Sequence, residues 1–190
     1  MLDVSTQLMS FPELETERCL LRAITYDDIP DFFEIMSDDS VTQYLPWETA
    51  TSFDMPKEYV KRYEVMFKEQ KGVIWGIINK ENNKMMGNCL LFHFNLAHHR
   101  AELGYALGSG WWRQGIMLEV TSKVVDYAFN KLNFHSLEAH IDPANTGSHK
   151  LLEKLGFVQE GYFRENFYNA EQDIFEDDAV FSLLKSDWAK

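Results

Sequence analysis

The spacing of apolar residues changes abruptly around residue 70 of this chain, and few folds accommodate the change. Over residues 54–69, apolar side chains recur at the helical spacing of three or four positions, which places them on one face. From residue 73 onward the period falls to two, in the runs 73–79 and 85–94 on either side of a short polar turn. The pattern predicts a helix followed by a β-hairpin, and therefore an α/β fold.

Helix and strand signals continue to alternate along the chain, and no linker rich in glycine, serine or proline interrupts them. Thr25 and the acids that follow it are typical of a helix N-terminus. The expected strands are 18–24, 73–79, 85–94, 100–107, 135–141, 157–167 and 174–184, and the later helices are 115–131 and 146–155. We expect a single domain over residues 1–190, with a mixed sheet of about seven strands, about four helices and a loose extension at 1–13.

The charge balance excludes two classes of partner, and the cysteines indicate the cellular compartment. The chain has 18 Lys and Arg against 30 Asp and Glu, a formal net charge of −12. Such a field repels nucleic-acid phosphates and anionic lipids, so neither nucleic acid nor a membrane is an expected partner. Cys19 and Cys89 are isolated, which favours a reducing cytoplasm. A monomer and a homodimer are both compatible with the sequence.

Residues 111–119 lie between an expected strand and a long expected helix. Gly115 opens that helix, and a glycine there lets backbone N–H groups point into open space, where the helix dipole adds partial positive charge. This geometry suits a pyrophosphate. A tight turn before an ordinary helix is the more frequent explanation of one such glycine, so the other motifs of the chain must decide.

Five ordered segments of the chain form a longer pattern. They are residues 14–22, 102–105, 112–119, 145–148 and 153–157, followed by Glu160 and Gly161 and by the closing residues 181–184. This series resembles the GNAT N-acetyltransferases, and within them the branch of bacterial ribosomal-protein N-terminal acetyltransferases. The family signature is Gln/Arg-x-x-Gly-x-Gly/Ala, from which this chain departs at Trp112 and Met117.

The resemblance implies a mostly antiparallel sheet that splays between its fourth and fifth strands and holds acetyl-CoA in the gap. The pantetheine arm would pair like an added strand with Tyr105, Ala106 and Leu107. The pyrophosphate would lie on the amides of Arg113, Gln114, Gly115, Ile116, Met117 and Leu118, with Asn145 near a cofactor amide. No metal is implied. Met117 leaves room for phosphate only if its side chain turns into the core.

Glu102 and Ser148 are the candidate catalytic residues. Acetyl transfer requires a neutral amine and a proton for the leaving thiolate. On an alternating strand Glu102 shares a face with two small residues, which leave room for a base that acts directly or through water; a salt bridge is the alternative. By resemblance Ser148 is the proton donor, because Leu152 replaces the tyrosine of many acetyltransferases; a solvent-facing helix serine is the alternative. Asn145 is equally well explained as a plain helix N-cap.

Three further sets of residues complete the expected site. The resemblance implies that Tyr44 and Trp47 border the acceptor, although a loop packed on the core explains them equally well. A glutamate of some branch members is replaced by Phe167, with Glu165 as a distant substitute. His93, His98 and His99 lack nearby cysteines or ordered carboxylates and are not expected to bind metal.

The expected function is that of a cytoplasmic, acetyl-CoA-dependent N-acetyltransferase in which an amine attacks the thioester directly. The branch resemblance alone points to a protein N-terminal α-amine, as in ribosomal-protein acetylation. A small amine such as a polyamine, an amino sugar or an antibiotic is the alternative acceptor. A catalytically silent acyl-CoA sensor is a further alternative, which the departures at Met117, Leu152 and Phe167 suggest.

Overall fold

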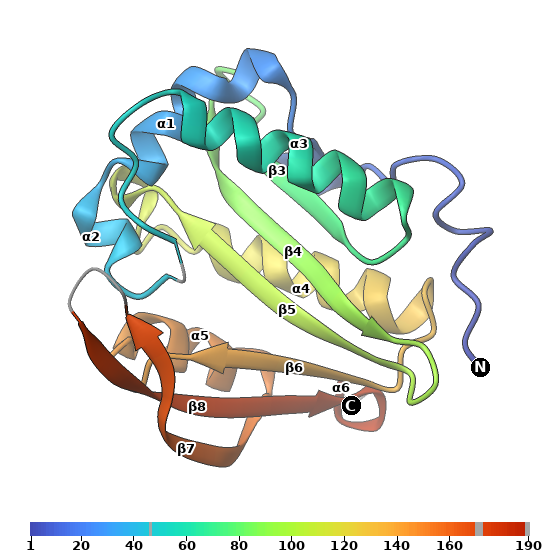
Figure 1. Cartoon of the computed structure of the whole chain (residues 1–190). Coiled ribbons are helices and arrows are strands. Elements are labelled where there is room, and N and C mark those ends of the chain that lie inside the picture. Colours follow the sequence, from blue (N-terminus) through green and yellow to red (C-terminus); the bar gives the residue numbers. More distant parts are fainter. Residues whose placement is uncertain (46, 170–172, 189–190) are drawn as a thin grey trace.

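The computed structural model describes residues 1–45, 47–169 and 173–188. In this part of the chain one sheet has the strand order β1-β2-β3-β4-β5-β6-β8-β7 (Figure 1). The strands are β1 (Leu14–Glu15), β2 (Cys19–Ala23), β3 (Val73–Asn79), β4 (Met85–Asn95), β5 (Arg100–Leu107), β6 (Ser136–Ile141), β7 (Val158–Asn169) and β8 (Ile174–Leu184). Every neighbouring pair is antiparallel except β5 and β6, which run parallel. The predicted mixed, mostly antiparallel sheet is confirmed.

Helices cover both faces of this sheet (Figure 1). They are α1 (Ile29–Met36), α2 (Asp39–Thr42), α3 (Asp54–Lys68), α4 (Ile116–Asn130), α5 (Thr146–Leu155) and α6 (Lys185–Trp188), with short 3-10 turns at Tyr26–Asp28 and Ser109–Trp111. On the face covered by α1 and α3, Phe32 and Val60 pack with Ile74 of β3. On the face covered by α4, Val124 packs in the core that contains Trp75. Because β3 is buried on both faces, its apolar run is nearly continuous.

Two expectations differ from the structure. The elements β1, α2 and α6 were not expected, because elements of two to four residues are too short to show a period. Residues 1–13 are not a loose extension: Val4 and Leu8 are buried in the main core. The Trp75 indole also donates a hydrogen bond to the carbonyl of Pro12, at 2.6 Å. The N-terminal segment therefore closes the edge of the core beside β1.

The parallel strands β5 and β6 separate soon after they meet. They pair only between Arg100–Glu102 and Ser136–Glu138. On its other side β5 stays paired with β4 as far as Leu107. From Leu103 onward β5 therefore has a free edge toward β6, and the two strands diverge visibly (Figure 1). The expected splay is confirmed.

Candidate active site

The loop before α4 adopts the unusual backbone that the sequence motif requires. Gly115 precedes the helix with φ of +77°, a left-handed conformation that side chains disfavour. Arg113 also has a positive φ, of 60°. Because the first N–H groups of a helix have no intrahelical acceptor, those of Ile116, Met117 and Leu118 lie at the positive end of the α4 dipole. Such an arrangement can bind an anion.

Arg18 fixes this loop against the start of β2. Its guanidinium donates to the carbonyl of Gln114 at 2.8 Å and pairs with Glu119 at 2.7 Å. The backbone N–H of Arg18 donates to the same carboxylate. Burial alone would raise the pKa of Glu119, but hydrogen bonds from Thr16 and Arg18 hold it below its usual value. The acid in the first turn of α4 is thus neutralised by Arg18, and the helix end remains favourable for an anion.

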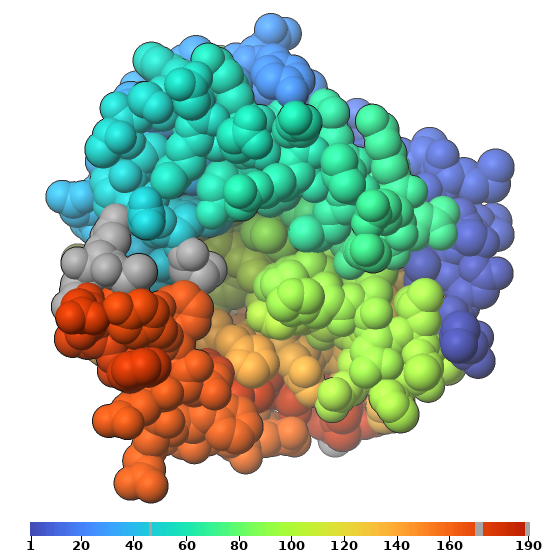
Figure 2. All heavy atoms as spheres, viewed as in Figure 1, coloured from blue at the N-terminus to red at the C-terminus, as the bar shows by residue number. Residues whose placement is uncertain are grey.

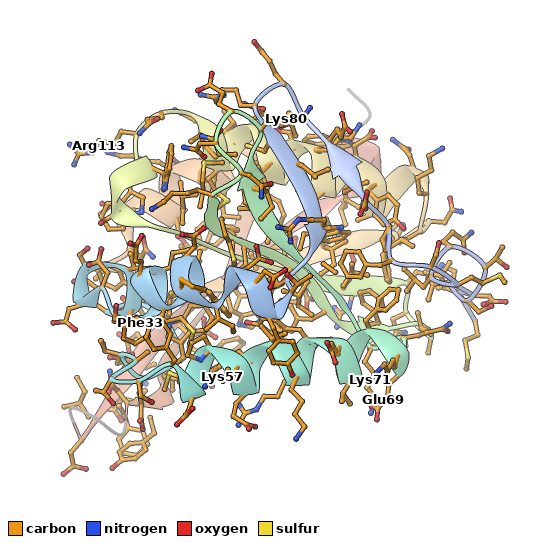
Figure 3. The ribbon with its side chains drawn as sticks, turned by 90° about the horizontal axis from the view of Figure 1, so that it is seen from above. Phe33, Lys57, Glu69, Lys71, Lys80 and Arg113 are labelled. Carbon is orange, nitrogen blue, oxygen red and sulfur yellow. The ribbon has the colours of Figure 1, made fainter. Side chains whose placement is uncertain are left out.

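The side chains around the loop leave its outer face open. Met117 and Leu118 pack against the main core, so Met117 does turn inward as phosphate binding would require. Gln114 donates back to the carbonyl of Gly110. Arg113 is exposed and projects away from the body of the protein (Figure 3). The Trp112 indole donates to the carbonyl of Leu107 at 2.7 Å, which ties the loop to the end of β5.

A cavity of about 160 Å³ lies at the splay. Its lining comes from the loop after α2, from β4, β5 and β6, and from the start of α5. The lining residues are Tyr44, Leu45, Trp47, Asn88, Leu90, Phe92, Glu102, Leu103, Gly104, Tyr105, Ala139, His140, Ile141, Asn145 and Ser148. The cavity therefore brings together both candidate catalytic residues, both candidate acceptor residues, Tyr105 and Asn145. Ala106 and Leu107 continue the free edge of β5 beyond it.

A larger hollow of about 720 Å³ lies elsewhere, between α3 and the end of β4 (Figure 2). Its lining includes Glu58, Lys61 and Arg62 of α3, together with His93. None of the residues expected to bind cofactor or acceptor belongs to it. We place the candidate active site at the smaller cavity, because the free edge of β5 borders it and the Trp112 indole ties the loop before α4 to the end of that edge.

Glu102 has an unexpected partner in His93. Its carboxylate lies 2.8 Å from Nδ1 of His93, and its side chain is 21% exposed. The β4–β5 register shifts between Phe92 and Asn95, and His93 has a φ of 49°. This irregularity turns the imidazole toward the face of Glu102. Sequence reasoning missed His93, because strict alternation would place it on the opposite face.

Two hydroxyl groups lie at the α5 side of the cavity. Asn145 caps α5 by accepting a hydrogen bond from the backbone N–H of Ser148 at 3.0 Å, so its explanation as an N-cap is confirmed. The Tyr105 hydroxyl is buried with no regular hydrogen bond to any described residue. Burial raises the pKa of Tyr105, and the nearby Ser148 side chain opposes that rise. Leu152 is fully buried in the core and supplies no proton donor.

The remaining candidate residues lie apart from the cavity. Phe167 is exposed on β7, and the Glu165 backbone N–H donates to Asp177 on β8. Neither lines the cavity. Within residues 1–45, 47–169 and 173–188, no three His, Cys, Asp or Glu side chains are grouped to hold a metal ion. His93 bonds to Glu102 instead.

Comparison with known proteins agrees with this geometry. Residues 18–158 match the model of the acetyltransferase (GNAT) domain. The uncharacterized N-acetyltransferase YoaA of Bacillus subtilis is 34% identical over 175 residues, which cover 92% of this chain and 98% of that protein. The ribosomal protein uS5-alanine N-acetyltransferase of Escherichia coli is 31% identical over 90 residues, 47% of this chain and 45% of that enzyme.

A solved structure extends the comparison to the fold. The crystal structure of spermidine N-acetyltransferase from Vibrio cholerae, in complex with CoA and spermine, has a TM-score of 0.78 to this chain. The two are 22% identical over 91% of this chain and 99% of that one, so the likeness shows the fold alone. With the domain match over most of its length and a relative more than 30% identical along nearly all of it, this chain belongs to the GNAT family of N-acetyltransferases.

Proposed function

We propose that this protein transfers the acetyl group of acetyl-CoA to a primary amine, by direct attack in a ternary complex, and that the acceptor is a protein N-terminal α-amine. The observation that carries the proposal is the free edge of β5 from Leu103 onward, whose end is tied by the Trp112 indole to the loop before α4. A pyrophosphate at α4 and an extended arm along β5 would lead from the surface to the cavity that holds Glu102 and Ser148.

The residues present fit acetyl-CoA, which would supply the activated thioester. The N–H groups of residues 116–118 would bind its phosphates, and Arg113 is exposed beside them. Tyr105 and Ala106 would pair with the pantetheine amides, while the Leu107 carbonyl is already bonded to Trp112. The free edge of β5 also supports the fit, because from Leu103 onward its outer backbone groups have no partner strand on the β6 side.

Glu102 would act as the base. It takes a proton from the acceptor ammonium, directly or through water, so that the neutral nitrogen can attack the thioester carbonyl carbon. The C–N bond then forms and the C–S bond breaks. His93 bonds to Glu102 and its side chain is 73% exposed, so it offers this proton a route to solvent. No covalent enzyme intermediate is needed.

The leaving thiolate must accept a proton. Ser148 is the proposed donor, since it lines the cavity and Leu152 cannot donate; the proton that the attacking nitrogen loses as the amide forms restores the Ser148 hydroxyl. A Ser148→Ala variant with unchanged kcat would remove it from the mechanism.

The acceptor class rests on the match to the uS5-alanine enzyme, which covers about half of each chain. A small amine is the second candidate, because the spermidine N-acetyltransferase shares the fold. We also propose a cytoplasmic location, because Cys19 and Cys89 are both free and buried. Among the described residues, no helix is long and apolar enough to span a membrane.

The test is thiol release from acetyl-CoA with a panel of N-terminal peptides, polyamines and aminoglycosides, together with calorimetry of acetyl-CoA binding. We expect binding, and turnover with peptides. Binding without turnover on any amine would favour a silent sensor, and turnover only on small amines would replace the acceptor class. Absence of binding would reject the proposal entirely.

A further inference from the structure

The cavity at the splay holds most of the unpaired buried polar atoms of the described structure. Apart from Tyr105, whose hydroxyl lies near Ser148, three described residues have buried side-chain nitrogen or oxygen atoms without a hydrogen-bond partner: Trp47, Tyr63 and Asn88. All but Tyr63 line the cavity. Buried polar atoms are normally paired, because leaving them unpaired costs free energy. Their concentration at one cavity indicates that a bound molecule supplies the missing partners.

Asn88 is the strongest of these features. It is 1% exposed, and neither Nδ2 nor Oδ1 of its side chain has a partner. It lies on β4 opposite Ala106, two positions from Leu90 and four from Phe92, so these three share a sheet face. A Cβ added at Gly104 would meet the side chains of Leu90 and Phe92, so position 104 of β5 belongs to the same sheet face. Leu90 packs against the cluster that contains Phe32 and Val60, so Asn88 lies on the sheet face covered by α1 and α3 and away from α4.

Trp47 supplies a second unpaired group on this side. Its ring packs edge-on against Tyr59 of α3, with 5.5 Å between ring centroids. This contact fixes the indole, and its Nε1 has no acceptor among the described residues. Trp47 can only donate a hydrogen bond, whereas the Asn88 amide can both donate and accept.

The chemistry of these groups distinguishes acceptor classes. A protonated polyamine offers only N–H donors, so it would leave the Asn88 Nδ2 and the Trp47 Nε1 unpaired. A peptide group offers one N–H and one C=O, which complement the Asn88 amide, and further carbonyls for Trp47. Four strand positions separate Asn88 from Phe92, the partner of Glu102, which is about 13 Å. An extended peptide covers this distance within its first three or four residues.

On the basis of the proposed function, we propose that Asn88, with Trp47, recognises a peptide group within the first residues of the acceptor, and that this pair selects peptides over polyamines. The contacts would be made with the substrate ground state as well as the transition state. Their loss should therefore raise KM for the peptide more than it lowers kcat.

The first test uses the Asn88→Leu variant, which keeps the approximate size of the side chain and removes both polar atoms. We expect its KM for a peptide acceptor to rise about tenfold and its KM for acetyl-CoA to stay at the wild-type value. Its melting temperature should stay the same or rise, because no buried polar atom is left unpaired at this position. Tyr63→Phe is the matched control, because it removes a buried, unpartnered hydroxyl outside the cavity. It should leave both KM values unchanged. An Asn88→Leu variant with wild-type KM for peptides would overturn the proposal.

The second test changes the substrate and needs no variant. In a series of peptides, each of the first three peptide bonds is replaced in turn by an ester, which removes one N–H. We expect one ester to raise KM with the wild-type enzyme, and Asn88→Leu to lose that discrimination. Equal KM values for all esters and the amide would overturn the role of Asn88 while peptide turnover stands. Absence of peptide turnover by the wild type would instead overturn the proposed function, and this inference with it.

Discussion

Asp28 is a buried carboxylate that is stabilised by hydrogen bonds from Arg22 and Thr25. It is 5% exposed, and both of its oxygens accept hydrogen bonds from Arg22 at 2.8 Å. The backbone N–H and the hydroxyl of Thr25 donate to it as well. Burial alone would raise the pKa of Asp28, but these bonds lower it below its usual value. The same pair joins β2 to the start of α1.

The Asp28→Asn substitution should lower the free energy of unfolding by about 3 kcal/mol at pH 7, because it leaves Arg22 without its buried partner. The pKa of Asp28 is lower in the folded than in the unfolded chain. Its stabilising effect is therefore fully present above about pH 4 and is lost as the pH falls through the folded pKa. Urea unfolding of both proteins at pH 7 and pH 3 measures this. The exposed Asp27→Asn variant is the control, and a stability difference that does not shrink in acid would contradict this role of the Asp28 charge.

Glu102→Gln tests the proposed base. It should lower kcat/KM about 100-fold with the fold intact, because the side chain can no longer accept a proton. The loss should be largest at low pH and should shrink above about pH 8, where an α-amine is already neutral. Glu138→Gln is the matched control. Glu138 lies on β6, directly opposite Glu102 of β5, but it pairs with Arg100 and does not line the cavity. Wild-type rates in Glu102→Gln would remove it from the mechanism.

At the scale of elements, the opening of α4 tests the phosphate proposal. Gly115 and Gly156 both have positive φ, 77° and 88°, so an alanine at either should cost about 1 kcal/mol of stability. Only Gly115→Ala should also weaken acetyl-CoA binding, because it disturbs the N–H groups at the start of α4. Calorimetric titration of both variants with acetyl-CoA distinguishes a loss of affinity from a loss of stability alone. Equal affinity in both would contradict a phosphate site at this helix.

Local patterns predicted the elements, but not the contacts between distant segments. The β3–β4 hairpin, the start of α4 and the cap of α5 by Asn145 follow from neighbouring residues. The pair of Arg18 and Glu119 joins positions 101 residues apart, which no local pattern can predict.

The unpredicted parts of the candidate site have similar causes. His93 reaches Glu102 only through an irregularity in β4. Asn88 follows the alternation of its strand, so its unpaired amide becomes evident only once its surroundings are known. The motifs therefore indicated where the candidate site lies, while its polar partners depend on how the strands meet.

At the scale of the whole molecule, the net charge of −12 opposes the binding of a polyanionic cofactor. If acetyl-CoA binds here, its phosphates must be held by backbone amides, the α4 dipole and Arg113, and the overall field must oppose binding. Added salt screens that repulsion as well as the local attraction. We expect the Kd for acetyl-CoA to change less than about threefold between 50 and 500 mM salt. A steep, many-fold loss of affinity would indicate binding through surface charges instead.

In the proposed reaction, an amine at the splay receives the acetyl group directly at its own nitrogen. The most direct measurement is mass spectrometry of a peptide that contains one internal lysine, after incubation with the enzyme and acetyl-CoA, with fragmentation to locate the added group. We expect acetylation of the α-amine, with the lysine unmodified and no acetyl group left on the enzyme. Acetylation of the lysine alone, or a stable acetyl-enzyme, would rule out direct transfer to an N-terminal α-amine.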